Sequence, residues 1–181
     1  MQAQKFRGMS DSSDIFPGLT LTLGHAASGK SLWAEGFARE SGAPLTYVAT
    51  ARLWDAETEA KARDHAARRG TDWRLVEAQT DLAGACAGLN GTVLIDCATM
   101  WLTNVMLDGG DWQAPAEAWL AAMAGARADF VVVSNDVGGG VTPDNALARR
   151  FQRAQGALNQ QLAAAADRVV MVTAGLPMRL K

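Results

Sequence analysis

The segment Gly24–Ser31 constrains this chain most strongly, because its sequence, GHAASGKS, fits the pattern GxxxxGK[ST]. The apolar run Leu19–Leu23 precedes it and a segment of helical period follows it, which is the context of a phosphate-binding loop. Glycines let backbone N–H groups turn towards phosphate oxygens, and the helix N-terminus adds a favourable dipole. The alternative is a glycine-rich turn that only caps a helix. We expect phosphate binding by Gly24, His25, Ala26, Ala27, Ser28, Gly29, Lys30 and Ser31.

Two side chains of this loop and one distant acid are expected to act on the nucleotide directly. Lys30 would reach the β and γ phosphates, and the Ser31 hydroxyl would ligate Mg²⁺. Asp96 ends the apolar run Thr92–Ile95, and an acid at the carboxyl end of a buried strand is where P-loop enzymes hold Mg²⁺. Aspartate also favours the N-cap of a following helix, and the two roles are compatible. We therefore expect Mg²⁺ at Ser31 and Asp96.

Short apolar runs alternate with longer alanine-rich segments of helical period. Hydrophobicity is continuous in Val93–Ile95 and Phe130–Val133, which is typical of strands covered on both faces. These patterns predict an α/β fold with a mostly parallel central sheet flanked by helices. The expected strands are Leu19–Leu23, Leu45–Ala49, Trp73–Glu77, Val93–Ile95, Phe130–Val133 and Val169–Thr173. The expected helices are Lys30–Ser41, Asp55–Gly70, Leu82–Leu89, Thr99–Leu107, Pro115–Ala126 and Pro143–Ala165, with Thr142 as cap of the last and Asp108–Pro115 as the most loop-like interior segment.

The length of 181 residues predicts one domain, residues 18–181, after a flexible tail of residues 1–17 in which Met9 is an alternative start. A net charge of −2 gives no general attraction to nucleic acid or anionic membranes. No run approaches the ~18 apolar residues of a membrane span, and the N-terminus lacks the apolar region of a secretory signal. Cys86 and Cys97 form no CxxC or Cys/His cluster, so neither a disulfide framework nor a zinc site is expected. We expect a cytoplasmic protein.

The segment Asp55–Arg69 carries acids in its first half and bases in its second. Helical spacing puts Lys61, His65 and Arg68 or Arg69 on one side. One interpretation is a solvated helix whose charges complement its dipole. The other is that the cations keep the imidazole neutral and nucleophilic and bind the phosphates of a nucleotide. The spacing alone leaves both open.

A second glycine-rich segment, SNDVGGGVTP at residues 134–143, follows the buried run Phe130–Val133. It therefore lies at the edge where open α/β sheets bind ligands. A flexible connection to a helix cap is the alternative, and sequence physics does not separate the two.

Several motifs occur in order over residues 19–181: LTLGHAASGKS, TYVATA, D-x-E…H-x-x-x-R, W-R-x-V-E, LIDCATMWLTN, SNDVGGGVTPDNALARRF, GALNQQLAAAAD and AGLPMRLK. The first is common to many NTPases, but the ordered set is far more specific. On these motifs the chain resembles the bifunctional adenosylcobinamide kinase/adenosylcobinamide-phosphate guanylyltransferase family of cobalamin biosynthesis. The resemblance implies a RecA-like P-loop NTPase core and a homotrimer with the histidine helix near a subunit boundary.

The resemblance also implies two reactions on a corrinoid substrate. ATP or GTP phosphorylates adenosylcobinamide, and GTP then donates GMP to the new phosphate through a GMP–histidine intermediate, releasing pyrophosphate. His65 matches the family's guanylylated histidine, and Lys30 the catalytic lysine. The family's nucleotide contacts carry over to the phosphate-binding loop and to Ala49, Thr50, Ala51, Arg68, Arg69, Glu77 and Asp96.

The sequence departs from the family pattern at both glycine-rich segments. His25 occupies a position where a small residue is common, Asp136 and Asp144 replace glutamates, and Thr142 replaces an apolar residue. Two other classes of function stay open on the residues alone. A plain P-loop small-molecule kinase needs no nucleophilic histidine, and a nucleotide-binding protein without turnover needs neither step.

Overall fold

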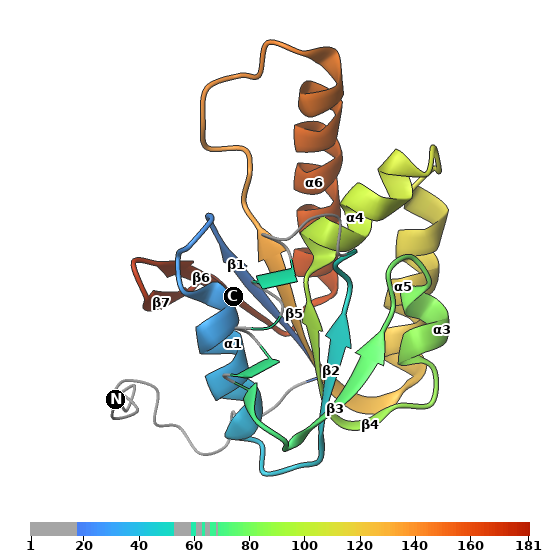
Figure 1. Cartoon of the computed structure of the whole chain (residues 1–181), viewed down its shortest axis with the longest axis vertical. Helices are drawn as coiled ribbons and strands as arrows, with labels where there is room; N and C mark the ends of the chain where they lie inside the picture. The colour runs from blue at the N-terminus through green and yellow to red at the C-terminus, as the bar shows by residue number, and fades with distance from the viewer. Residues whose placement is uncertain (1–17, 53–58, 61–62, 64–65, 68) are drawn as a thin grey trace.

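The computed structural model describes residues 18–52, 59–60, 63, 66–67 and 69–181. Its centre is a seven-stranded sheet in the order β3-β2-β4-β5-β1-β6-β7 (Figure 1). All neighbouring strands pair in parallel except β6 and β7, which are antiparallel. The strands are β1 (Leu19–Gly24), β2 (Leu45–Ala49), β3 (Trp73–Glu77), β4 (Asn90–Asp96), β5 (Arg127–Asn135), β6 (Arg168–Thr173) and β7 (Leu176–Arg179). The helices are α1 (Lys30–Arg39), α3 (Leu82–Cys86), α4 (Ala98–Leu107), α5 (Gln113–Gly125) and α6 (Ala146–Ala165).

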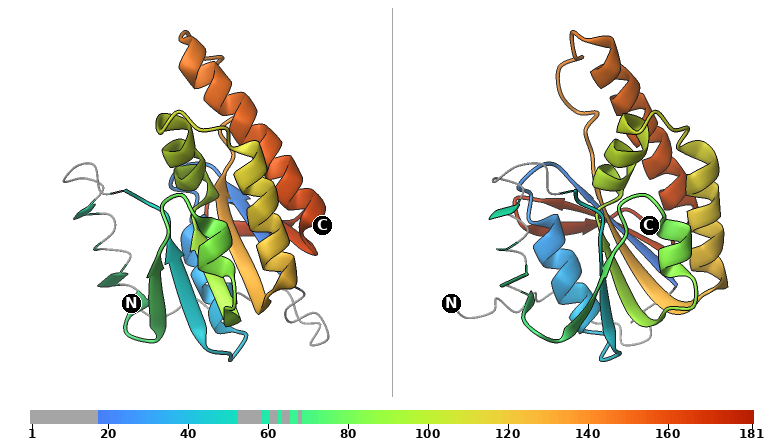
Figure 2. Two further views of the ribbon diagram at one scale, coloured as in Figure 1. Left: turned by 90° about the vertical axis from the view of Figure 1, so that its right-hand side faces the viewer. Right: turned by 45° about the vertical axis from the view of Figure 1, so that its right-hand side comes forward.

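The sheet separates two apolar cores, one on each face (Figure 2). Trp33 and Ala34 of α1 pack on one face, against Val131 and Val133 of β5 among others. Helices α3 to α6 cover the opposite face, where Trp101 and Trp119 of α4 and α5 are fully buried. Successive β5 residues thus belong to opposite cores, which explains its uninterrupted hydrophobicity. The predicted α/β class with a mostly parallel sheet is confirmed.

All six predicted strands exist, and two of them, β2 and β3, have the predicted bounds. The seventh strand, β7, was not predicted. It is an edge strand of four residues that contains Pro177, and a proline at a sheet edge is tolerated although it weakens the sequence pattern of a strand.

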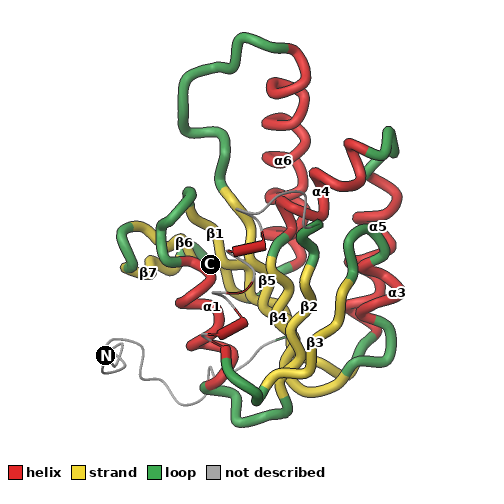
Figure 3. Tube along the Cα trace, viewed as in Figure 1, coloured by secondary structure: helices red, strands yellow, loops and turns green. Residues whose placement is uncertain are grey.

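The predicted start of the last helix is wrong. Its N-cap is Asn145, whose side chain accepts a hydrogen bond from the Ala148 N–H at 2.7 Å, not Thr142. The residues before Asn145 are held outside the helix because Arg149 Nη1 donates to the Pro143 and Asp144 carbonyls, at 2.9 and 2.7 Å. Figure 3 shows this loop running alongside the first turns of α6, beyond the edge of the sheet.

The other predicted helices also differ at their ends, by a single residue at the start of α4 and at the end of α5 and by more at three other ends. The first ends at Arg39 instead of Ser41, α3 ends at Cys86 instead of Leu89, and α5 begins at Gln113 instead of Pro115. The last difference also shortens the predicted loop Asp108–Pro115.

Two predictions concern residues that the structure does not describe. The predicted tail, residues 1–17, lies entirely outside the described residues, and so does most of the predicted helix Asp55–Gly70. Within the described part of the chain, no helix combines the length and the apolar character needed to cross a membrane.

Candidate functional site

The glycine-rich turn between β1 and α1 has the shape of a phosphate-binding loop. Its last residue before α1, Gly29, adopts a positive φ of 91°, and Ala27 a φ of 56°. The Lys30 ammonium lies over the loop, donating to the His25 carbonyl at 3.2 Å, while the Ser28 N–H donates to the same oxygen at 3.3 Å. The Ser28 hydroxyl is buried and has no hydrogen-bond partner among the described residues. A polar atom left without a partner inside this turn is what a bound anion would satisfy.

Neighbouring strands hold this loop from two sides. The Gly175 N–H, from the turn between β6 and β7, donates to the Ser28 carbonyl at 2.8 Å. The Asp136 N–H, just after β5, donates to the Gly24 carbonyl at 3.1 Å. A Cβ at Gly29 would lie 3.2 Å from the Gly175 Cα, so the glycine is required both by its φ and by this close approach.

Asp96 lies at the carboxyl end of β4, as the sequence predicts, and is the last residue of that strand. The Tyr47 hydroxyl donates to its Oδ2 at 3.0 Å, and burial raises the pKa of Tyr47. The pKa of the Cys97 thiol is raised to about 11, chiefly by burial; the charge of Asp96 also raises it and that of Lys30 lowers it. Because β1, β5 and β4 pair in parallel, Asp96 at the end of β4 and Lys30 after the turn that follows β1 lie at the same edge of the sheet.

Arg69 packs over the ring of Tyr47, the residue whose hydroxyl binds Asp96. Its guanidinium carbon lies 3.5 Å from the centre of the Tyr47 ring, a cation–π contact. The residue is only 8% exposed, and Arg39 donates to its carbonyl oxygen. Arg69 is therefore joined to Asp96 through Tyr47. The other predicted arginine, Arg68, and the predicted nucleophile, His65, lie outside the described residues.

The predicted residues of the TYVATA motif follow β2 at the same edge. The Thr50 hydroxyl donates to the Cys97 carbonyl at 2.8 Å and accepts from the Cys97 N–H at 2.7 Å. Thr50 is fully buried, so its side chain fixes the junction after Asp96, whereas the exposed parts of Ala49 and Ala51 remain open to a ligand. The register pairs Ala49 with both Asp96 and Glu77. Glu77 is thus two strands from Asp96, about 10 Å away at the usual strand spacing.

Asn104 supports this edge and was missed at the sequence level. Its Nδ2 donates to the carbonyls of Thr50 and Gln79, both at 2.8 Å, from a fully buried position on α4. The signal that could have found it is an asparagine inside an apolar helical segment, because a buried amide is retained only with partners.

A second missed group lies between β5 and α6. Gln155 Nε2 donates to the Ser134 hydroxyl at 3.0 Å, and that hydroxyl donates to Asn159 Oδ1 at 2.6 Å. Asn159 Nδ2 donates to the Asn135 carbonyl at 3.0 Å, and the Asn135 N–H donates to Thr99 Oγ1 at 2.8 Å. These bonds fix the end of β5, from which the second glycine-rich loop leaves.

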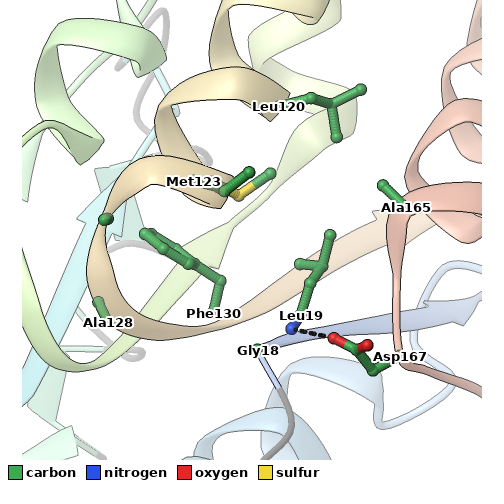
Figure 4. A pocket seen from close by; sticks show the side chains of 10 residues that line it. Gly18, Leu19, Leu120, Met123, Ala128, Phe130, Ala165 and Asp167 are labelled. Atoms are coloured by element: carbon green, nitrogen blue, oxygen red, sulfur yellow. Dashed lines mark hydrogen bonds between the residues drawn. The ribbon is translucent and has the colours of Figure 1, made fainter.

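An apolar cavity of about 240 Å³ lies at the opposite edge of the sheet, near the start of β1 (Figure 4). Leu19, Met123 and Phe130 line it, and its Asp167 carboxylate already accepts from the Leu19 N–H at 3.0 Å. It is therefore separate from the phosphate-binding loop, which lies at the other end of the same strand.

Comparisons with known proteins agree on one family. The family model for cobinamide kinase / cobinamide phosphate guanyltransferase matches residues 20–180. The bifunctional adenosylcobalamin biosynthesis protein CobP of Pseudomonas aeruginosa is 40% identical, over 89% of this chain and 96% of that protein. The corresponding CobU protein of Escherichia coli K12 is 36% identical, over 90% of this chain and 99% of its own length.

Solved structures with low sequence identity show the same fold. The RadB recombinase is 18% identical with a TM-score of 0.51, covering 86% of this chain and 74% of that one. The flagellar accessory protein FlaH from Methanocaldococcus jannaschii is 11% identical with a TM-score of 0.51, covering 92% and 79%. These neighbours confirm the RecA-like P-loop fold. The family match over nearly the whole chain shows, in addition, that this chain belongs to the cobinamide kinase / cobinamide phosphate guanyltransferase family.

Proposed function

We propose that this chain performs two successive transfers on one corrinoid. It phosphorylates the hydroxyl of adenosylcobinamide with ATP or GTP, and then transfers GMP from GTP to the new phosphate. The observation that carries the proposal is the family match over residues 20–180, together with a phosphate-binding loop whose Lys30 lies at the same edge of the sheet as Asp96.

In the first reaction, the corrinoid hydroxyl oxygen forms a bond to the γ-phosphorus while the bond from that phosphorus to the β–γ bridging oxygen breaks. The hydroxyl proton leaves to solvent, and the nucleoside diphosphate departs. Lys30 and the backbone N–H groups of the loop would offset the charge that develops on the phosphate oxygens.

The donor set at this edge fits Mg²⁺. Ser31 and Asp96 offer a hydroxyl and a carboxylate, and Mg²⁺ in nucleotide enzymes is bound through one or two such protein oxygens together with substrate phosphates and water. The Tyr47 hydroxyl, donating to Asp96 Oδ2 at 3.0 Å, orients this carboxylate. The bound ion would supply positive charge to the phosphate oxygens.

In the second reaction, the neutral imidazole of His65 attacks the α-phosphorus of GTP, and the bond to the bridging oxygen breaks to release pyrophosphate. An oxygen of cobinamide phosphate then attacks the same phosphorus, the P–N bond breaks, and His65 is freed. Arg68 and Arg69 would bind the added negative charge. The contact of Arg69 with Tyr47 supports this role, because it brings the end of the histidine segment towards Asp96. Ala49, Ala51 and Glu77 would contact the nucleotide at the same edge, and the predicted Thr50 would support them from its buried position through its bonds to Cys97.

The transfer of GMP is tested by adduct mapping. The protein is incubated with GTP and Mg²⁺, and the acid-labile, alkali-stable adduct is located by mass spectrometry after digestion. Trypsin separates the two histidines, because His65 falls in the peptide Asp64–Arg68 and His25 in a different one. We expect GMP on the peptide of residues 64–68 and its complete loss in His65→Ala, with an unchanged unfolding midpoint.

The two steps have distinct outcomes. Incubation with cobinamide and each triphosphate in turn, followed by mass spectrometry, is expected to give cobinamide phosphate and then GDP-cobinamide. Phosphorylated product without any histidine adduct would mean a plain small-molecule kinase. Binding of GTP without either product would mean a nucleotide-binding protein without turnover. An adduct retained in His65→Ala would remove that residue from the mechanism.

We also propose a homotrimer in the cytoplasm. The trimer is what the resemblance of the sequence motifs implies, and both cysteines are free and buried, as expected in a reducing compartment. Light scattering coupled to size exclusion, expected to give three times the 19.1 kDa chain mass, tests the assembly. A monomeric mass would contradict it.

A further inference from the structure

The His25 side chain joins the two glycine-rich loops of the candidate site. Its Nδ1 lies 2.9 Å from the carbonyl oxygen of Asp136. A carbonyl oxygen only accepts hydrogen bonds, so Nδ1 must carry the hydrogen and donate it. The ring therefore reaches from the second residue of the phosphate-binding loop to the first residue after β5.

The backbone strengthens this contact. Gly24, the residue before His25, accepts at its carbonyl from the Asp136 N–H at 3.1 Å. Both backbone groups of Asp136 are thus bound by consecutive residues of the phosphate-binding loop. The loop also passes close to the ring further on, because a Cβ built at Gly139 would lie 3.4 Å from His25 Cε1.

Other contacts hold the same loop to its own helix instead. Gln152 Nε2 on α6 donates to the Val137 carbonyl at 2.9 Å, and Arg149 binds two carbonyls near the end of the loop. Among the described residues, His25 is the side chain of the phosphate-binding loop that contacts the second loop. This bond fixes the start of the second loop to the nucleotide site.

The backbone of His25 also faces the nucleotide. Its carbonyl accepts from Lys30 Nζ at 3.2 Å and from the Ser28 N–H at 3.3 Å. A triphosphate that attracts the Lys30 ammonium competes with the first of these bonds. Binding of the triphosphate therefore changes the bonds of His25, the residue whose ring binds Asp136.

We propose that His25 is a positioning residue, which couples occupation of the phosphate-binding loop to the placement of residues 136–140 and so sets how well the corrinoid acceptor is held for phosphoryl transfer. This inference rests on the proposed kinase step. It concerns a residue at which this chain departs from the small residue common in its family, so it describes a property of this chain.

Three variants separate the hydrogen bond from the volume of the ring. His25→Asn keeps an N–H donor at the δ position, and His25→Leu fills similar space without a donor. Gly125→Ala at the end of α5 is the control outside both loops, because a Cβ at Gly125 meets no atom within 4 Å, and it should leave the KM for cobinamide unchanged. Each is measured for the Kd of a non-hydrolysable triphosphate and for the KM and kcat of cobinamide phosphorylation.

We expect His25→Leu to raise the KM for cobinamide about three- to tenfold, the range that corresponds to one lost hydrogen bond. The Kd of the triphosphate should change less than about twofold, because the loop binds phosphates through its backbone. His25→Asn should restore the KM to within about twofold of the parent. Equal impairment of the Asn and Leu variants would overturn the proposal, as would an unchanged KM in His25→Leu.

Hydrogen exchange gives a second readout that does not depend on turnover. The triphosphate analogue should slow amide exchange in residues 136–140 of the parent and of His25→Asn, but not of His25→Leu. Slowing of the same size in His25→Leu would overturn the coupling. If the parent protein does not phosphorylate cobinamide at all, the proposed function fails, and the exchange comparison still decides whether His25 couples the two loops.

Discussion

The two glycine-rich loops at the carboxyl edge of the sheet differ in what holds them. The phosphate-binding loop is fixed by backbone bonds, from its own turn and from Gly175 and Asp136 on either side. The loop between β5 and α6 is fixed largely by side chains, those of His25, Arg149 and Gln152. Its tip extends into solvent, with Val141 94% exposed. The geometry of the phosphate-binding loop is therefore set by backbone bonds, whereas that of the second loop depends on a few individual side chains.

The largest expected difference between the two loops concerns catalysis. Lys30→Ala should lower the kcat of phosphorylation and the rate of adduct formation about 10²–10³-fold, because a charge aimed at the phosphates is lost. Gln152→Ala, which releases one carbonyl of the other loop, should change the KM for cobinamide less than about tenfold and leave adduct formation unaffected. Steady-state assays of both steps measure this. Similar losses in the two variants would show that the loops contribute alike.

The next difference concerns stability. Gly29→Ala should destabilise the fold by about 2 kcal/mol, because φ is 91° there and Gly175 Cα lies 3.2 Å from the new Cβ. Gly36→Ala within α1 is the matched control. It meets no atom within 4 Å and should stabilise the helix by about 0.5–1 kcal/mol. Urea unfolding compares the two, and a neutral Gly29→Ala would mean that the loop is not fixed as described.

The smallest effect concerns the start of α6. Asn145→Ala should cost about 1 kcal/mol, because it removes the side chain that accepts from the Ala148 N–H at 2.7 Å. Thr142→Ala should stay within about 0.5 kcal/mol, as an exposed residue outside the helix. Thermal unfolding separates them, and the reverse order would restore the cap that the sequence predicts.

The sequence predicts this molecule well where structure is local. The phosphate-binding loop is recognisable because eight consecutive residues contain its whole motif, and β2 and β3 have the predicted bounds. The start of the last helix was predicted wrongly because a side chain inside the helix turns back to bind the residues before it. Arg149 keeps Pro143 and Asp144 out of α6, and nothing near Pro143 in the sequence announces it.

The supports of the candidate site could not be predicted because they join residues that are far apart in the sequence. Tyr47 and Asp96 are 49 positions apart, and Thr50 and Cys97 are 47 apart, so their pairing depends on β2 lying beside β4. Once the strand order is known, the register Ala49–Asp96 brings all of these residues together. The roles of His65 and Arg68 stay predictions, since both lie outside the described residues.

The burial of both cysteines has a practical consequence for labelling chemistry. Maleimides and similar reagents react with the thiolate form of cysteine. In this protein both thiols are buried, and burial also raises their pKa. We therefore expect Cys86 and Cys97 to react slowly in the folded chain, so that a fluorophore or spin label can be attached to a single introduced cysteine without first replacing them.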